Sequence, residues 1–246
     1  MTTGFSLLVH GKSKVGKSWL SDTAPGPRLV LDAEGGNGTT WTPSSKKIWN
    51  PTVEAPPAAD GTWETCIVHV RQFMDVQRAY EWLNSGQHPF RSVTIDSVSE
   101  TQQRGVDEIA GTAQMQTQNW GELLRRMSKL IRDFRDLVNH PTNPLAVVIF
   151  IAMTREVNGM QQPYVQGQLA TILPYQVDVV GYLQRIPDFN VPGKMDRFIM
   201  FQPDPAYSCG ERVGGRLGAW LEIGDNDRTV EQMLDMIFNN GKENNR

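Results

Sequence analysis

Apolar and polar positions along the chain follow two different periods, which predict alternating strands and helices. Nearly continuous apolar or β-branched runs at residues 5–10, 28–32, 65–70, 92–97 and 145–152 predict buried strands. Apolar residues at helical spacing predict amphipathic helices over residues 73–83, 120–138 and 230–238. This pattern favours the α/β class, with a central, mostly parallel sheet flanked by helices.

Other segments complete the predicted architecture. Residues 178–186 and 197–202 flank a Pro- and Gly-containing turn and predict a C-terminal antiparallel hairpin that extends the sheet. Three stretches without a sustained period are predicted as loops, at residues 37–61, 111–118 and 158–168. Residues 239–246 are predicted to form a flexible tail. We expect the whole chain, residues 1–246, to form one domain with residues 37–61 as a loop or insertion.

A phosphate-binding motif directly follows the first predicted strand. It has the form G-x-x-x-x-G-K-S and reads Gly11-Lys12-Ser13-Lys14-Val15-Gly16-Lys17-Ser18. Glycines let backbone N–H groups approach a polyphosphate, and the helix that starts here points its positive end at the anion. Lys17 is expected to lie between the outer phosphates, and Ser18 to offer its hydroxyl to Mg²⁺. The motif and the adjacent Trp19 therefore predict a site for ATP.

Polar residues at the ends of later strands are further candidates for this site. Glu34 follows the strand at residues 28–32 and is a candidate general base for water, with an acidic turn residue as the less favoured alternative. Asp96 ends an apolar strand, as expected of a carboxylate that holds Mg²⁺. Thr154 follows the buried strand at residues 145–152, where a polar side chain could sense the terminal phosphate.

Composition limits the range of functions. The chain has 246 residues, 39% hydrophobic and 21% charged, as is usual for a soluble protein. It lacks a long apolar run and a signal-peptide pattern, so we expect a cytoplasmic protein without a membrane partner. Cys66 and Cys209 form neither a zinc motif nor a disulfide framework. A net charge of −3 gives no global attraction to nucleic acid, so DNA binding would need a local patch or several subunits.

Two groups of basic residues allow alternative interpretations. Arg212 and Arg216 lie in a glycine-rich segment and could reach the nucleotide of a neighbouring subunit, or could be surface residues of a β-turn. The polar face of the helix at residues 120–138 contains arginines and one lysine, interrupted by aspartates. We interpret this face as a solvated surface in preference to a nucleic-acid patch.

The order of these motifs resembles the RecA-like recombinase core, and more narrowly the phage-encoded ATPases that act in single-strand annealing or recombination. The resemblance covers residues 5–220 in the order of elements, with the P-loop as its specific motif. It implies a RecA-like P-loop NTPase fold, Lys17 and Ser18 as Walker A residues, Asp96 as Walker B and Glu34 as the catalytic glutamate. It also implies DNA-binding loops at residues 113–119 and 158–168, and cations acting across a subunit interface near Arg212 or Arg216.

The chain departs from the pattern of this family at two points. Thr154 and Arg155 stand where the family often has an amide that senses the terminal phosphate. Residues 210–212 read Gly-Glu-Arg where phage relatives often have Lys-Asp-Arg. These differences put in question the sensor and one of the cationic contacts across the interface.

The resemblance implies a Mg²⁺-dependent ATPase with Glu34 and Lys17 in catalysis. Such an enzyme would bind single-stranded DNA as a ring or filament and promote recombination in a bacteriophage, within the host cytoplasm and with a single-strand-binding protein as a further partner. One alternative is a helicase loader or replication ATPase that acts on a protein partner. Another is an assembly module that binds ATP with negligible turnover.

Overall fold

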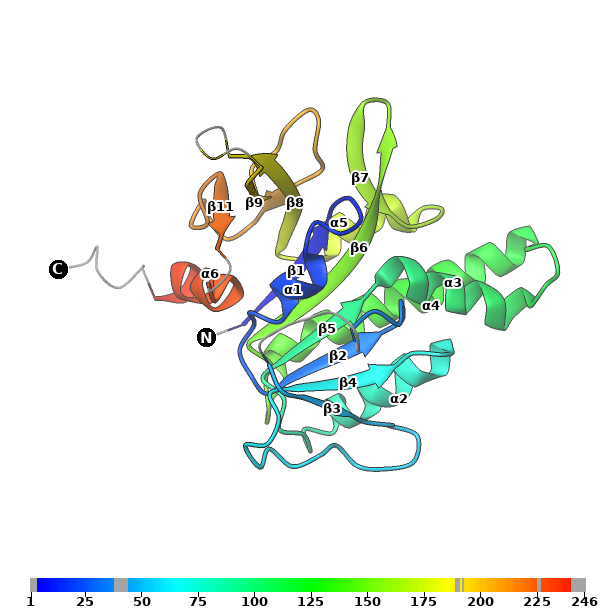
Figure 1. Ribbon diagram of the computed structural model, residues 1–246. Coiled ribbons are helices and arrows are strands. Elements are labelled where there is room, and N and C mark those ends of the chain that lie inside the picture. The colour runs from blue at the N-terminus through cyan, green and yellow to red at the C-terminus, as the bar shows by residue number, and fades with distance from the viewer. Residues whose placement is uncertain (1–3, 38–43, 189–190, 192, 225–226, 240–246) are drawn as a thin grey trace.

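A computed structural model describes residues 4–37, 44–188, 191, 193–224 and 227–239, and contains one large mixed sheet with helices on both faces (Figure 1). The strands are β1 (Phe5–His10), β2 (Arg28–Asp32), β3 (Lys46–Ile48), β4 (Thr65–His69), β5 (Ser92–Asp96), β6 (Val147–Val157), β7 (Met160–Tyr164), β8 (Val179–Pro187), β9 (Met195–Met200), β10 (Gly210–Glu211) and β11 (Trp220–Ile223). The helices are α1 (Lys17–Ser21), α2 (Phe73–Asn84), α3 (Val98–Ala110), α4 (Thr117–Asp136), the 3₁₀ turn η1 (Leu137–Asn139), α5 (Leu169–Gln176) and α6 (Thr229–Phe238).

The strand order is β11-β9-β8-β1-β6-β5-β2-β4-β3, with β10 paired to β8 and β7 paired to β6. All neighbouring pairs from β8 through β1 to β3 are parallel, whereas β9, β10 and β11 pair antiparallel at the other end. The carboxyl ends of β1, β2, β5 and β6 therefore meet at one edge of the sheet, where open α/β sheets bind their ligands. This mostly parallel sheet with an antiparallel C-terminal extension is the P-loop NTPase fold that the sequence predicts.

Two hydrophobic cores lie on opposite faces of the sheet. Helices α2 to α5 cover one face and pack on side chains such as Leu8 and Phe150. Helices α1 and α6 cover the other face and pack on side chains such as Leu7 and Ile149. Because successive strand residues point to opposite faces, continuous apolar runs such as residues 147–152 are buried on both sides.

Most elements predicted from periodicity are confirmed. The predicted strands at residues 5–10, 28–32, 65–70 and 92–97 correspond to β1, β2, β4 and β5. The predicted helices at residues 73–83, 120–138 and 230–238 correspond to α2, to α4 with η1, and to α6. The predicted hairpin of residues 178–186 and 197–202 is the antiparallel β8–β9 pair.

The predicted loops at residues 37–61 and 111–118 contain parts of regular elements. The stretch at residues 37–61 includes the edge strand β3 and the buried Trp49, while residues 38–43 lie outside the described part. Residues 117 and 118 of the second loop belong to α4, and neither the preceding α3 nor the later α5 was predicted. Most of the tail predicted at residues 239–246 lies outside the described residues, since the description ends at Asn239.

The segment at residues 158–168 is not simply a polar loop, because residues 160–164 form β7. This strand pairs antiparallel with the end of β6, and the β6–β7 hairpin extends beyond the sheet in Figure 1. Its turn is Asn158-Gly159, with φ of 50° and 81°. Such a pair matches the positive φ angles that a two-residue hairpin turn requires.

Among the described residues, no helix has the length and apolar character needed to cross a bilayer.

Candidate nucleotide-binding site

The predicted phosphate-binding loop connects the buried end of β1 to the start of α1. Lys14 and Gly16 adopt positive φ angles of 62° and 107°, which turn the chain back on itself. Gly11 must be a glycine for a steric reason, because a Cβ there would lie 2.3 Å from the carbonyl oxygen of Leu183 on β8. The loop is therefore held closely between β8 and the first turn of α1.

Lys17 lies over this loop. Its Nζ donates to the carbonyl oxygens of Gly11 and Lys12, at 3.0 Å each. Burial lowers the pKa of Lys17, while the nearby carboxylates of Glu34 and Asp96 act in the opposite direction. An ammonium held here favours an anion seated over the loop, as the sequence predicts for Lys17.

Asp96 lies at the carboxyl end of β5 and faces Ser18. The Ser18 hydroxyl donates to Asp96 Oδ2 at 2.6 Å, and Asn37 Nδ2 donates to the same oxygen at 2.9 Å. Burial raises the pKa of Asp96, and these two hydrogen bonds oppose that rise because they favour the carboxylate. The predicted metal ligands Ser18 and Asp96 are thus brought together.

This pair fits Mg²⁺. A hydroxyl and a carboxylate are hard oxygen ligands, and Mg²⁺ in nucleotide sites is commonly held by few protein oxygens together with water and phosphate. In the described part of the chain, no cluster of three or more His, Cys, Asp or Glu side chains could form an all-protein metal cage. When bound, Mg²⁺ would neutralise phosphate charge next to Ser18 and Asp96.

Glu34 lies just beyond β2 and is exposed. Its Oε1 accepts a hydrogen bond of 2.6 Å from the Ser97 hydroxyl, and Ser97 directly follows Asp96. The backbone N–H of Ala33 also donates to the Asp96 carbonyl oxygen at 2.7 Å. The predicted base is therefore tied to the same strand end as the predicted metal ligand.

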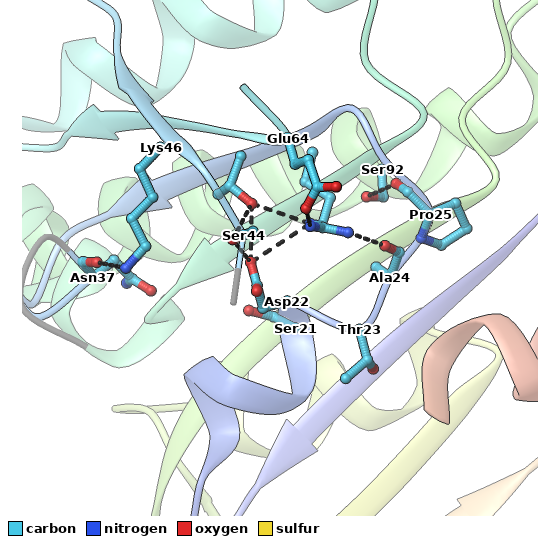
Figure 2. Close-up of polar contacts among 12 residues, drawn as sticks. Ser21, Asp22, Thr23, Ala24, Pro25, Asn37, Ser44, Lys46, Glu64 and Ser92 are labelled. Carbon is cyan, nitrogen blue, oxygen red and sulfur yellow. Dashed lines mark hydrogen bonds and ion pairs between the residues drawn. The ribbon is translucent and has the colours of Figure 1, made fainter. Parts of the chain in front are cut away.

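Asp32 and Asn37 shape the loop that contains Glu34. The buried Asp32 carboxylate accepts from the backbone N–H groups of Gly35 and Asn37, at 2.9 and 3.0 Å. Lys46 Nζ donates to the carbonyl oxygen of Asn37 at 2.8 Å (Figure 2). Asn37 is thereby held where its amide reaches Asp96.

His10, the last residue of β1, is fully buried beneath the loop. Its Nε2 lies 2.6 Å from the carbonyl oxygen of Ser208, which can only accept, so Nε2 carries the proton. Its Nδ1 lies 3.2 Å from the Thr154 hydroxyl. Burial lowers the pKa of His10 to about 4. The nearby Lys17 also lowers this pKa, whereas the hydrogen bond to Ser208 raises it.

Thr154 is therefore linked to the phosphate-binding loop through His10. Its hydroxyl also lies 3.1 Å from the carbonyl oxygen of Gln162 on β7, and its one proton can be donated either to that oxygen or to His10 Nδ1. Thr154 thus connects β1, β6 and the β6–β7 hairpin. Its role as a sensor of the terminal phosphate stays a prediction.

A buried polar network fixes the far end of α1. Arg28, at the start of β2, donates to the Ala24 carbonyl oxygen at 2.7 Å and to Thr65 Oγ1 at 3.1 Å. Asp22 accepts from Ser44 at 2.7 Å and from Thr65 at 2.9 Å (Figure 2). The short helix behind the phosphate-binding loop is thereby anchored to β2 and β4.

Both predicted interface arginines donate to backbone carbonyl oxygens, and Arg212 lies away from this edge. Arg212 donates to the carbonyl oxygens of Tyr175 and Val177, and its Nε lies 3.7 Å from Asp178. Asp178 in turn accepts from Ser6 at the start of β1, the end opposite the phosphate-binding loop. Arg216 donates to the carbonyl oxygen of Ile237 on α6. A contact of either arginine with the nucleotide of a neighbouring subunit stays a prediction.

Sequence analysis missed three residues of the site, namely His10, Asn37 and Ser97. Ser97 follows a strand and stands three residues before Glu100, whose N–H donates to the Ser97 hydroxyl at 3.2 Å. That spacing is a capping signal for α3. His10 and Asn37 have no comparable local signal, because their partners come from distant strands.

Comparison with known protein families agrees with this geometry. A family model described as "AAA domain" matches residues 3–213. A search of curated proteins found no match. The phosphate-binding loop, the Ser18–Asp96 pair and the family match together show that the chain belongs to the AAA-domain family, a family of P-loop ATPases.

Proposed function

We propose that this protein is a Mg²⁺-dependent ATPase that assembles on single-stranded DNA and acts in phage-type recombination or annealing. The main support for ATP hydrolysis is that Lys17, the Ser18–Asp96 pair and Glu34 lie together at one edge of the sheet. Lys17 would neutralise the outer phosphates, Ser18 and Asp96 would hold Mg²⁺, and Glu34 would orient the attacking water.

The DNA-binding part of the proposal is supported by the β6–β7 hairpin. The Arg155 guanidinium lies 5.5 Å from the ring centroid of Tyr164, and Tyr164 is 41% exposed. Aromatic and arginine side chains are typical partners of unstacked bases. Because the net charge is −3, one subunit would bind weakly, and assembly would add the contacts of several subunits.

The test is ATP hydrolysis measured with and without single-stranded DNA, at low and physiological salt, with Lys17→Ala as the blank. We expect turnover that DNA stimulates, that weakens with salt and that the variant abolishes. Turnover that is unaffected by DNA would contradict the recombinase role and favour an ATPase that acts on a protein partner. Nucleotide binding without turnover in the wild type would favour an assembly module.

A further inference from the structure

The peptide bond that joins Ala33 to Glu34 is held on both of its sides. Its N–H, on Glu34, donates to the Asp96 carbonyl oxygen at 3.4 Å. Its carbonyl oxygen, on Ala33, accepts from Arg104 Nη2 at 3.4 Å. Because a peptide unit is planar, contacts on opposite sides fix its orientation. That orientation sets the direction in which the Glu34 side chain leaves the backbone.

Helix α3 aims Arg104 at this peptide. Arg104 Nη2 also lies 3.1 Å from Oε1 of Glu100, one turn earlier in the helix. A glutamate four residues before a cationic side chain is the favourable order for an ion pair on a helix. The Glu100 N–H donates to the Ser97 hydroxyl, which itself donates to Glu34. The start of α3 therefore holds Glu34 twice, through its carboxylate and through the peptide that precedes it.

Helix stability alone does not account for the place of Arg104. The side chains of Arg104 and Glu100 are 33% and 28% exposed, and partly exposed ion pairs of this kind contribute little to stability. The Nε–H of Arg104 is buried and has no hydrogen-bond partner among the described residues. A buried donor without a partner destabilises the folded state by more than such a pair stabilises it. The contact with the Ala33 carbonyl oxygen gives this arrangement a purpose.

We propose that Arg104 is a positioning residue for ATP hydrolysis, which holds the Ala33–Glu34 peptide so that the Glu34 carboxylate faces the attacking water. The inference rests on the proposed function, in which Glu34 orients that water. Glu34 needs such support because its side chain is exposed and Gly35 and Gly36 follow it, residues that restrict the backbone least. Arg104 acts through Glu34.

The first experiment measures kcat and KM for ATP. A misplaced catalytic group slows chemistry without weakening substrate binding, so Arg104→Ala should lower kcat by ~10-fold and leave KM unchanged. Arg104→Lys keeps the positive charge and should recover part of the loss. Arg126→Ala is the matched control, because Arg126 is 34% exposed and also pairs with a glutamate of α3, Glu108, at 2.8 Å. This control should keep the wild-type kcat.

A double-mutant cycle tests whether Arg104 acts through Glu34. Arg104→Ala is added to Glu34→Gln, and the residual hydrolysis is followed under single-turnover conditions. Without the carboxylate there is nothing left to position, so the added change should alter the residual rate by about twofold at most. The same fold-loss in the wild type and in Glu34→Gln would show independent effects and would overturn the inference.

Urea unfolding without nucleotide separates positioning from general support of α3. We expect Arg104→Ala to unfold at nearly the urea concentration of the wild type. A loss of kcat that comes with a large loss of stability, or that Arg126→Ala reproduces, would overturn the role of Arg104.

The inference and the proposed function fail in different ways. Wild-type kcat in Arg104→Ala, with hydrolysis abolished in Glu34→Gln, overturns the role of Arg104 alone. A wild-type protein that does not hydrolyse ATP, or a Glu34→Gln variant as active as the wild type, overturns the proposed function and this inference with it.

Discussion

At the scale of single residues, Ser97 connects the predicted chemistry to the fold. Its hydroxyl donates to Glu34 and accepts from the N–H of Glu100, so one side chain positions the proposed general base and caps α3. It directly follows Asp96, so the end of β5 places both the proposed metal ligand and the hydroxyl that binds Glu34. In the proposed mechanism Ser97 is a positioning residue, since it acts through Glu34.

Ser97→Ala is expected to lower kcat for ATP hydrolysis by ~10-fold or more, because Glu34 loses the bond that orients it. The lost cap should lower the free energy of unfolding by about 1 kcal/mol. Steady-state kinetics and urea unfolding measure the two effects. Ser97→Thr keeps the hydroxyl and should recover most of kcat with little change in KM. An alanine variant with wild-type kcat would show that this hydrogen bond has no part in catalysis.

His10 makes stability depend on pH. Its pKa falls from 6.5 to about 4 in the folded protein because burial disfavours the imidazolium. Between these two values the unfolded chain binds more protons than the folded one, so the free energy of unfolding decreases as the pH falls from 6.5 towards 4. The full difference amounts to about 3 kcal/mol.

Urea unfolding measured from pH 6.5 to pH 4 should show the free energy of unfolding decrease. In His10→Gln this decrease should be smaller than in the wild type. His88, whose pKa burial also lowers to about 4, contributes a similar share and remains in the variant. His88→Gln is therefore the matched control, because it removes the other imidazole with a lowered pKa and keeps His10. An identical pH dependence in the wild type and His10→Gln would contradict the account of His10.

At the scale of elements, the sequence predicts most of those whose buried faces consist of large apolar residues, with the short helix α5 as an exception. The missed helix α3 buries Val98, Thr101, Gln102 and Gly105, a face with one large aliphatic side chain and therefore no visible period. Gly105 is needed because a Cβ there would lie 2.7 Å from Leu123 Cδ1 on α4. The packing that stabilises α3 comes from distant elements, which a local pattern does not reveal.

Gln102 shows how a polar residue can hold such a helix in place. Its Oε1 accepts from the N–H of Gln166 at 2.6 Å, and its Nε2 lies 3.2 Å from the Gln166 carbonyl oxygen, tying α3 to the segment after β7. Gln102→Ala leaves the N–H and carbonyl oxygen of Gln166 without this partner. We expect it to lower the free energy of unfolding, measured with urea, by ~1–3 kcal/mol. Gln103→Ala, a change at a more accessible position, should have a much smaller effect. Equal effects of the two changes would contradict this role.

At the scale of the whole molecule, parallel topology explains how distant sequence segments form one site. The ends of β1, β2, β5 and β6 lie at the same edge, so the loop at residues 11–18, Glu34, Asp96 and Thr154 could be placed there from the sequence. Sequence could not give the contacts between strands, such as Asn37 with Asp96 or His10 with Thr154. These depend on register and on side-chain direction, which are set by the packing of both cores.

The central claim is that this edge hydrolyses ATP with Glu34 as the general base. The most direct test is single-turnover hydrolysis by Glu34→Gln, with ATP affinity measured on the same sample. We expect hydrolysis to fall by ~100-fold or more while ATP binds as in the wild type, because the amide keeps a hydrogen-bond acceptor for Ser97 but is not a base. Hydrolysis at the wild-type rate in Glu34→Gln would contradict the account.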